Sequence, residues 1–400
     1  MSHPHANDLP GGFRYAACAA GIKKSGKPDL ALIVADRPAI CAGTFTTNRV
    51  VAAPVILTRE RISSGLCQAI LVNSGNANAC TGAQGLADAR RCTALAAAAL
   101  GIDEGLVAVC STGVIGVPLP MGCFEEQLPQ LARQLAGDQA TAVAEAIRTT
   151  DAFPKVASRC ITVGGREVRI LGLAKGAGMI HPDMATMLAF VMTDAALDSP
   201  LAGTLLRTAV SRSFNRITVD RDTSTNDTVL LLASGASGAP ALAADAPETQ
   251  VFAAALDEVL MELAKMIVRD GEGATKLVRI QVEGAASEAD ALAVARSIAT
   301  SALVKTAFFG ADANWGRIIA AAGYAGVELD QERVRILFND VVMVENGLGL
   351  GASQEALATE VLKKPEFTVT VDLGLGAGSA WYYTSDLGYE YVRINADYRS

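Results

Sequence analysis

The stretch 175–190, KGAGMIHPDMATMLAF, decides how this 400-residue chain is interpreted. Its first part is rich in glycine, which adopts backbone conformations that other residues avoid. An apolar run, 187–192, follows it and is typical of a buried strand. The sequence therefore predicts that Thr186 places a small hydroxyl side chain at the start of a buried strand, directly behind an unusual loop.

A threonine in such a position can act as a self-cleaving nucleophile. Its hydroxyl attacks the carbonyl of Ala185, the chain breaks between Ala185 and Thr186, and the freed α-amino group becomes a base beside its own hydroxyl. An ordinary glycine-rich turn is the simpler interpretation of an isolated Ala-Thr pair. The histidine content favours the nucleophile, because two of the three histidines, His3 and His5, lie in a polar N-terminal tail. A turn-forming structural role is at least as good an interpretation of His181, whereas an α-amino group with a pKa of about 7.7–8.0 supplies the base.

Composition excludes several classes of protein. The net charge of −8 and the pI near 5.1 argue against nucleic acid as a partner, because phosphate recognition needs a basic surface. No apolar run reaches the roughly 20 residues of a membrane span, and the first residues lack the pattern of a signal peptide. We expect a soluble cytoplasmic protein, with no nucleic-acid or membrane partner, whose length suggests two domains or one domain with a satellite.

The cysteines give no sign of a metal centre. None of the eight has CxxC spacing, and the histidines cannot complete a zinc site. The sequence predicts no metal ligands and eight reduced core cysteines, because most lie in apolar surroundings. They are Cys18, Cys41, Cys67, Cys80, Cys92, Cys110, Cys123 and Cys160.

Segments with strand and helix patterns alternate along the chain, which predicts an α/β protein with layered mixed sheets. Helical spacing marks 83–100, 199–214 and 252–267, and a hairpin is expected around Gly164 and Gly165. Short apolar runs predict further strands, including 30–35, 51–57, 69–73, 107–110, 229–233, 277–282 and 389–394. No dinucleotide-binding fingerprint or phosphate-binding Walker loop is present.

Several motifs together resemble those of one family, the ornithine acetyltransferases, which are the glutamate N-acetyltransferases of arginine biosynthesis. The motifs are 175–190 (above), 73–79 (NSGNANA), 111–116 (STGVIG), 149–155 (TTDAFPK), 270–276 (DGEGATK), 314–317 (NWGR) and 395–400 (NADYRS). The resemblance covers nearly the whole chain except the first dozen residues and the loop 234–249. It implies an ornithine acetyltransferase / DmpA-like fold with a second, smaller α/β domain.

The resemblance also implies the chemistry. The chain would cleave into 1–185 and 186–400, and Thr186 would carry acetyl from N2-acetylornithine to glutamate with no cofactor. Thr112 and the backbone N–H of Gly113 would stabilise the oxyanion. Acetyl-CoA would be a co-substrate if the protein is bifunctional, which the sequence leaves open.

Substrate contacts are likewise implied by the resemblance. Lys175 suits a carboxylate and Glu272 an ammonium group, while Thr149, Asn395 and Ser400 would add neutral hydrogen bonds beside Thr186. Lys155 and Arg317 are expected to be structural or surface charges. The two fragments would remain together as an α2β2 heterotetramer.

Two other functions stay open. A related amidase with an N-terminal nucleophile would release acyl groups to water, and a non-catalytic binding protein would remain a single uncleaved chain.

Overall fold

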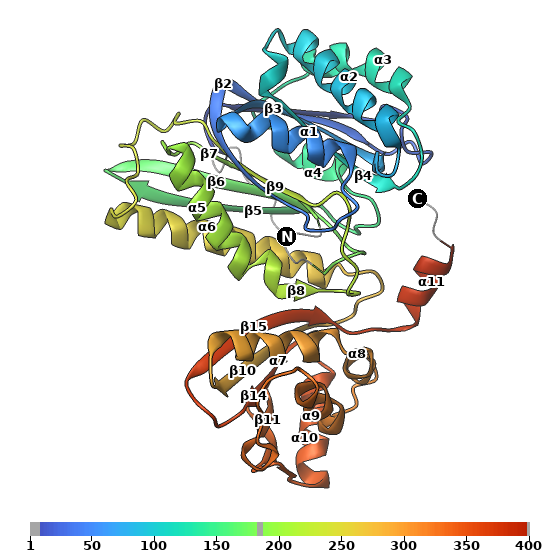
Figure 1. Cartoon of the computed structure of the whole chain (residues 1–400), viewed down its shortest axis with the longest axis vertical. Helices are drawn as coiled ribbons and strands as arrows, with labels where there is room; N and C mark the ends of the chain where they lie inside the picture. Colours follow the sequence, from blue (N-terminus) through green and yellow to red (C-terminus); the bar gives the residue numbers. More distant parts are fainter. Residues whose placement is uncertain (1–8, 182–186, 398–400) are drawn as a thin grey trace.

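The computed structural model describes residues 9–181 and 187–397. These residues form two lobes, each built around a β-sheet, with the first lobe at the top of Figure 1 and the second below it. The predicted reactive pair, Ala185 and Thr186, and the predicted substrate contact Ser400 lie outside the described residues.

The sheet of the first lobe takes strands from both sides of residue 186. In the described part of the chain it has eight strands, in the order β4-β3-β2-β9-β7-β6-β5, with β1 paired to β2. The strands are β1 Phe13–Cys18, β2 Leu30–Phe45, β3 Leu66–Asn76, β4 Val107–Val114, β5 Lys155–Val163, β6 Arg166–Lys175, β7 Leu188–Thr193 and β9 Thr228–Ala233. Strand β7 lies between β6 and β9. The strand that follows Thr186 is therefore an internal strand of this sheet.

Successive side chains of a strand enter two different apolar cores, and this alternation shows that the two halves of the sheet face each other. In β2, Leu30 and Leu32 join one apolar core and Ala31 and Ile33 join another. Phe190 of β7 belongs to the same core as Ile33, although β7 is in the other half of the sheet. Both faces of these strands are buried, so successive side chains are apolar rather than alternately apolar and polar. The result is two β-layers with a shared core between them.

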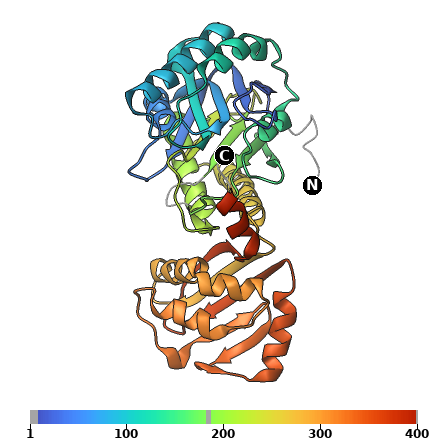
Figure 2. The same cartoon turned by 90° about the vertical axis from the view of Figure 1, so that its right-hand side faces the viewer.

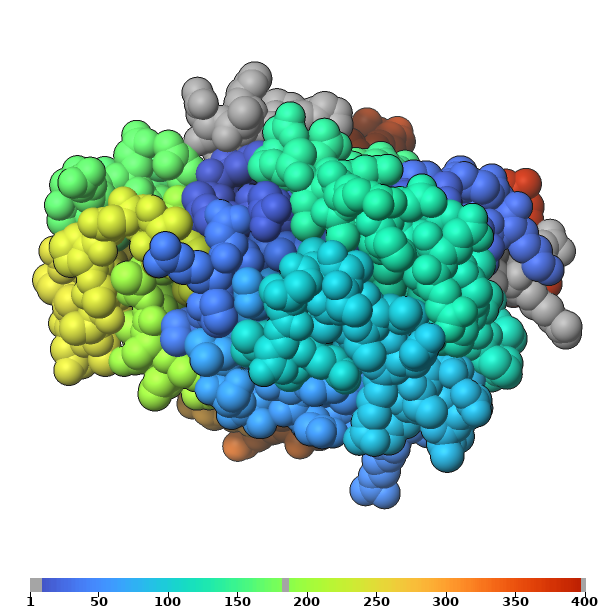
Figure 3. Space-filling view, turned by 90° about the horizontal axis from the view of Figure 1, so that it is seen from above, coloured from blue at the N-terminus to red at the C-terminus, as the bar shows by residue number. Residues whose placement is uncertain are grey.

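Helices cover the outer faces of the two β-layers. Helices α1 Ala53–Arg61, α2 Gly82–Leu100 and α3 Met121–Arg133 pack on one side, and α5 Ser199–Arg212 and α6 Pro247–Arg269 pack on the other. Helix α4 Ala140–Ala146 contributes to the core between the layers. Seen from above, this face of the lobe is formed mostly by residues of the first half of the chain (Figure 3). The lobe is therefore a four-layer α/β/β/α sandwich.

The second lobe is a smaller α/β unit made wholly from residues after 186. Its sheet has the order β13-β12-β11-β14-β10-β15-β8, and helices pack on it around a separate core. The strands are β8 Ile217–Thr218, β10 Leu277–Ala285, β11 Arg335–Phe338, β12 Val341–Glu345, β13 Leu348–Gly349, β14 Glu366–Asp372 and β15 Gly378–Ser385. The helices are α7 Glu288–Thr300, α8 Ala302–Phe309, α9 Trp315–Gly323 and α10 Ala352–Leu362. Single 3₁₀ turns occur at Ile62–Ser64, Glu104–Leu106, Phe214–Arg216 and Gln331–Arg333.

After β15 the chain leaves the second lobe and returns toward the first. It forms the final helix, α11 Tyr389–Asp397, which lies between the lobes in Figures 1 and 2. The backbone of Gly273 approaches this helix so closely that an added Cβ would lie 2.5 Å from the Tyr391 nitrogen. The C-terminal segment is therefore held against the residues that follow α6.

The layered, mixed α/β fold with a smaller second α/β region is as predicted, but two short strands are not. The run 51–57 lies mostly in α1, which begins with Pro54 in its first turn, a position that favours a helix start. The run 389–394 lies in α11, where Tyr389 and Val392 are exposed and none of the described strands lies alongside to pair with it. Short apolar runs do not distinguish helix from strand by periodicity alone.

The cysteine prediction is also partly wrong. Cys41, Cys67, Cys92 and Cys110 are buried as expected, but Cys80 and Cys160 are exposed. Cys160 lies on β5 with its side chain outward, because alternate residues of this edge strand face solvent.

In the described part of the chain, no helix alone has the length and hydropathy needed to cross a membrane. Only α7 and α8 taken together meet those criteria, and the chain bends by 60° between them.

Candidate active site

A buried lysine at the end of β6 brings the predicted site residues together. The Lys175 ammonium donates to Thr149 Oγ1 at 2.8 Å and to Thr112 Oγ1 at 3.3 Å. Thr112 comes from β4 in the other β-layer, so this contact joins the two layers at one end of the sandwich. Lys175 also pairs in register with Leu188, the first residue of β7. The three predicted side chains therefore meet where the strand after Thr186 begins.

Gly113 has a conformation and a setting that other residues cannot share. Its φ is +132°, and an added Cβ would lie 2.3 Å from the carbonyl carbon of Gly75 on β3. The close approach of two backbones requires glycine at this position. The close approach of β4 to β3 thus fixes where the Gly113 N–H and the neighbouring Thr112 hydroxyl lie, as an oxyanion-stabilising pair requires.

Buried amides hold the ends of β3 and β4. Ser111 Oγ donates to Asn73 Oδ1 at 2.6 Å. The Asn226 amide donates to the carbonyl oxygens of Ser111 at 2.9 Å and Ala77 at 2.6 Å. The two Asn226 bonds satisfy buried backbone carbonyl oxygens near the ends of β3 and β4. Because Ser111 precedes Thr112, the same bonds fix the position of the Thr112 hydroxyl.

An ion cluster lies beneath Lys175. The Lys155 ammonium contacts Asp151 Oδ1 at 2.7 Å and Asp270 Oδ2 at 2.6 Å, and its side chain is completely buried. Burial would raise the pKa of the Asp151 carboxyl, but the Lys155 and Lys175 ammonium groups outweigh this and hold that pKa well below its usual value. Of the two alternatives expected for Lys155, the structure supports a structural charge and excludes a surface charge.

Asp151 connects this cluster to the predicted substrate contacts. Its two carboxylate oxygens accept from the backbone N–H groups of Thr149 at 3.0 Å and Gly176 at 2.6 Å. Asp270 accepts from the N–H of Ala152 at 3.0 Å. Lys175 and Thr149 are joined by a hydrogen bond between their side chains. The buried Asp151 carboxylate therefore holds the backbone at Thr149 and at Gly176, the residue after Lys175.

Lys175 itself is in an environment that disfavours its charge. Burial lowers the pKa of its ammonium group, while Asp151 acts in the opposite direction and Lys155 adds to the lowering. An anionic ligand beside Lys175 would restore the balance, because opposite charges favour the ionised form. The side chain is therefore suited to a carboxylate.

Glu272 and Asn395 form the opposite side of the site. Glu272 is 9 % exposed, and its Oε2 accepts from Asn395 Nδ2 at 2.8 Å. The Glu272 N–H donates to the Ala177 carbonyl at 3.0 Å, and its carboxyl group lies so close to Gly178 that a Cβ there would approach within 2.5 Å. Glu272 thus joins the glycine-rich loop to α11, rather than lying in solvent.

The structure also shows the contacts of Arg317 and His181, the two other basic residues considered from the sequence. Arg317 donates from Nη1 to the Leu303 carbonyl at 2.8 Å, which is a structural contact on the second lobe. His181 is buried, with Nδ1 3.2 Å from Thr218 Oγ1 and Nε2 2.8 Å from Arg296 Nη2. These contacts support the structural interpretation of His181. Among residues 9–181 and 187–397, no three His, Cys, Asp or Glu side chains are grouped to hold a metal ion.

Sequence reasoning missed the polar residues that support the site from the segment 218–227. Asn226 holds the end of β4, and Asp220 accepts from backbone N–H groups of the glycine-rich loop. The signal was present as the polar run 220–228, DRDTSTNDT, whose last four residues, 225–228, are buried. Buried polar residues in such number need specific partners.

The structure thus joins a buried lysine and two threonine hydroxyls at one end of an α/β sandwich, an arrangement that can hold hydrogen-bond donors in place for acyl transfer. The chain belongs to the ArgJ family, whose model matches residues 14–400. It is 61% identical to the arginine biosynthesis bifunctional protein ArgJ of Syntrophotalea carbinolica over 389 residues, which cover 97% of this chain and 99% of the relative.

Two solved structures are also similar. The crystal structure of the arginine biosynthesis bifunctional protein ArgJ from Bacillus halodurans is 46% identical, with a TM-score of 0.51, and covers 52% of this chain and 98% of its own. The ornithine acetyltransferase of Mycobacterium tuberculosis, complexed with ornithine, is 39% identical, with a TM-score of 0.40, and covers 44% of this chain and 94% of its own.

Proposed function

We propose that this protein transfers the acetyl group of N2-acetyl-L-ornithine to L-glutamate in arginine biosynthesis. The observation that carries the proposal is the bond of Lys175 to both Thr112 and Thr149, next to the start of β7. Membership of the ArgJ family, and the names of the relatives, support the pathway and the class of enzyme.

The proposed reaction begins with self-cleavage between Ala185 and Thr186, in which the Thr186 hydroxyl displaces its own amine from the Ala185 carbonyl and water then hydrolyses the resulting ester. The Thr186 hydroxyl oxygen then attacks the acetyl carbonyl of acetylornithine, and its own α-amino group accepts the hydroxyl proton. The amide bond breaks, the proton passes to the leaving amine of ornithine, and acetyl-Thr186 remains. The amine of glutamate attacks this ester, so that N-acetylglutamate leaves and the hydroxyl is restored.

Thr112 and Gly113 have the role of oxyanion donors in both half-reactions. Each half-reaction passes through a tetrahedral intermediate whose negative oxygen needs fixed donors. The Thr112 hydroxyl is held at a defined strand end, and the Gly113 backbone conformation is fixed by its approach to β3. Lys175 is available for the α-carboxylate that both substrates carry.

Glu272 has the role of recognising the side-chain ammonium of ornithine. Its carboxylate is nearly buried and is already held by Asn395, so its direction is defined. Thr149, Asn395 and Ser400 supply neutral hydrogen bonds to the substrates. No cofactor is needed for acetyl transfer, and acetyl-CoA is a second donor in the bifunctional form of the reaction.

The fragments 1–185 and 186–400 stay together in this proposal, as an α2β2 heterotetramer. The first sheet supports their association, because β7 and β9 of the second fragment lie among strands of the first. Separation would expose the shared apolar core on both fragments.

The test is an acetyl-transfer assay with N2-acetylornithine in the presence and absence of glutamate. We expect ornithine and N-acetylglutamate in equal amounts with glutamate, and at most one equivalent of ornithine per site without it. Continuous release of acetate without glutamate would instead identify an amidase, and no reaction would identify a binding protein.

A further inference from the structure

Asp220, in the segment after β8, binds the loop that leads to the reactive junction. Its Oδ2 accepts from the Met179 N–H at 2.6 Å, and its Oδ1 accepts from the Ile180 N–H at 2.7 Å. Met179 has a φ of +56°, which a side-chain-bearing residue adopts only when its surroundings enforce it. One carboxylate thus supplies the partners that hold this strained turn six residues before Thr186.

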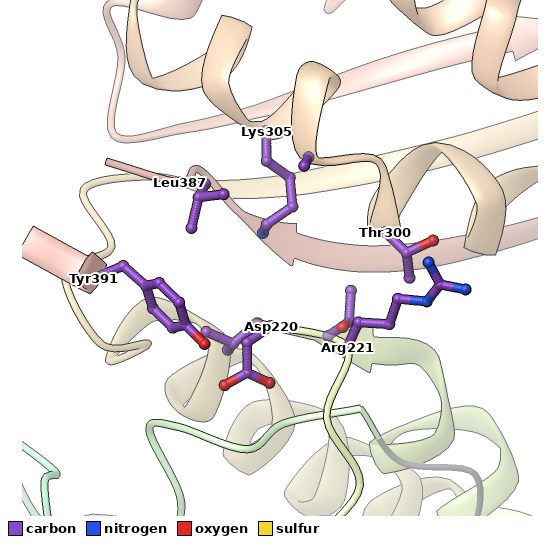
Figure 4. A pocket seen from close by; sticks show the side chains of 9 residues that line it. Asp220, Arg221, Thr300, Lys305, Leu387 and Tyr391 are labelled. Carbon is purple, nitrogen blue, oxygen red and sulfur yellow. The ribbon is translucent and has the colours of Figure 1, made fainter. Parts of the chain in front are cut away.

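The same carboxylate contacts the C-terminal helix. The Tyr391 phenol and the Asp220 carboxylate lie side by side at the wall of a cavity of about 90 Å³ (Figure 4). Burial, followed by the charge of Asp220, raises the pKa of the Tyr391 phenol. The phenol therefore keeps its proton beside the Asp220 carboxylate at neutral pH.

Tyr391 is one helical turn from the candidate substrate contact. Asn395 Nδ2 donates to the Tyr391 carbonyl at 3.0 Å and to Glu272 Oε2 at 2.8 Å. Residues four apart lie on the same face of a helix. The contact between Tyr391 and Asp220 therefore determines where Asn395 lies relative to Glu272.

We propose that Asp220 is a positioning residue that aligns the glycine-rich loop for self-cleavage and anchors α11 for substrate binding. The inference rests on the proposed function, because it assigns Asp220 a part in that cleavage and transfer. After cleavage, Met179 and Ile180 belong to the first fragment, whereas Asp220 and Tyr391 belong to the second. The same bonds then keep the end of the first fragment beside the site.

The first variant is Asp220→Asn, compared with Asp222→Asn, which changes an exposed neighbouring acid in the same way. The amide has one acceptor oxygen where the carboxylate has two, so one loop N–H or the Tyr391 hydroxyl faces an NH₂ donor. Small misplacement of reacting groups can cost on the order of 10²-fold in rate. We expect Asp220→Asn to slow self-cleavage by about that factor, with Asp222→Asn cleaving at the wild-type rate.

Cleavage is followed by denaturing mass spectrometry of protein synthesised in a pulse, with Thr186→Ala as the uncleaved reference. Circular dichroism of the same samples establishes that the variant is folded. If the wild type does not cleave, the proposed function fails. If the wild type and folded Asp220→Asn cleave at the same rate, only the role of Asp220 fails.

The second variant, Tyr391→Phe, separates the two parts of the proposal and remains informative if Asp220→Asn does not fold. It removes the contact with α11 and leaves both loop bonds, so cleavage should stay normal. The KM for acetylornithine should rise about tenfold while kcat changes little, because Asn395 is less well placed. Tyr389→Phe, on an exposed position of the same helix, is the control. An unchanged KM in Tyr391→Phe would contradict the anchoring role of Asp220.

Discussion

The two sides of the candidate site are held in place by different means. One side, the strand wall, consists of Thr112, Thr149 and Lys175 and rests on a completely buried ion cluster and on the amides at the end of β4. The other side, the helix wall, consists of Glu272 and Asn395 and depends on α11, near the end of the chain.

The difference in burial is large. Lys155, beneath the strand wall, has no exposed side-chain surface, whereas Tyr389 and Val392 of α11 are 83% and 66% exposed. Elements with few buried contacts open at lower free-energy cost than core strands. The comparison teaches that the groups assigned to the oxyanion and to the substrate α-carboxylate are on the rigid side, whereas the group assigned to the ornithine side chain depends on the side that can adjust. Three variants can break or sharpen this contrast.

The largest effect should come from the support of the strand wall. Lys155→Met leaves Asp151 and Asp270 buried together without their cation, and removing one partner of a buried ion pair costs about 3–5 kcal/mol. We expect a loss of that size in the free energy of unfolding, measured by urea titration.

Lys363→Met is the matched control, because its ion pair with Glu360 is on the surface. Such pairs contribute about 0–1 kcal/mol. Equal losses in the two variants would show that the strand wall does not depend on its ion cluster.

The next effect concerns the chemistry on the strand wall. Thr112→Val keeps the shape of the side chain and removes the hydroxyl, and loss of one oxyanion donor typically lowers kcat by about 10²–10³. Thermal stability should change little. Thr204→Val, at an exposed position of α5, should retain wild-type kcat. A Thr112→Val rate within a few-fold of wild type would remove this hydroxyl from the reaction.

The smallest effect is expected on the helix wall. Glu272→Gln keeps a partner for Asn395 but removes the charge that would face the ornithine ammonium. We expect KM for acetylornithine to rise about tenfold, or roughly 1.4 kcal/mol, with a smaller change for glutamate, which lacks that cation. Glu258→Gln, an exposed acid on α6, should alter neither value. Equal changes for both substrates would assign Glu272 another role.

The parts of the site that form short continuous motifs could be predicted from the sequence. The glycine-rich stretch 175–190 could be identified because its small residues and the apolar run after them stand in adjacent positions, whereas Thr112 and Gly113 were implied by the resemblance of 111–116 to the family. The structure then brought Thr112, Thr149 and Lys175 within hydrogen-bond distance, as the resemblance implied. The roles of these residues in catalysis and binding stay predictions.

What could not be predicted depends on contacts between distant segments. Lys155 could be read as structural or as a surface charge, because its partner Asp270 is 115 positions away along the chain. Asp220 was missed for the same reason, because the two N–H groups that donate hydrogen bonds to it are 40 and 41 positions away along the chain. The helices α1 and α11 were mistaken for strands because their short apolar runs fit both the helix and the strand period.

The central claim is that Thr186 becomes the N-terminus of a second chain whose first strand is an internal strand of the shared sheet. Denaturing mass spectrometry of freshly purified protein tests it directly, with native mass measurement of the same sample. We predict two fragments, 1–185 and 186–400, in equal amounts within one particle larger than 41.4 kDa, and a single full-length chain for Thr186→Ala. A wild-type protein that transfers acetyl groups while remaining one uncleaved chain would contradict the account.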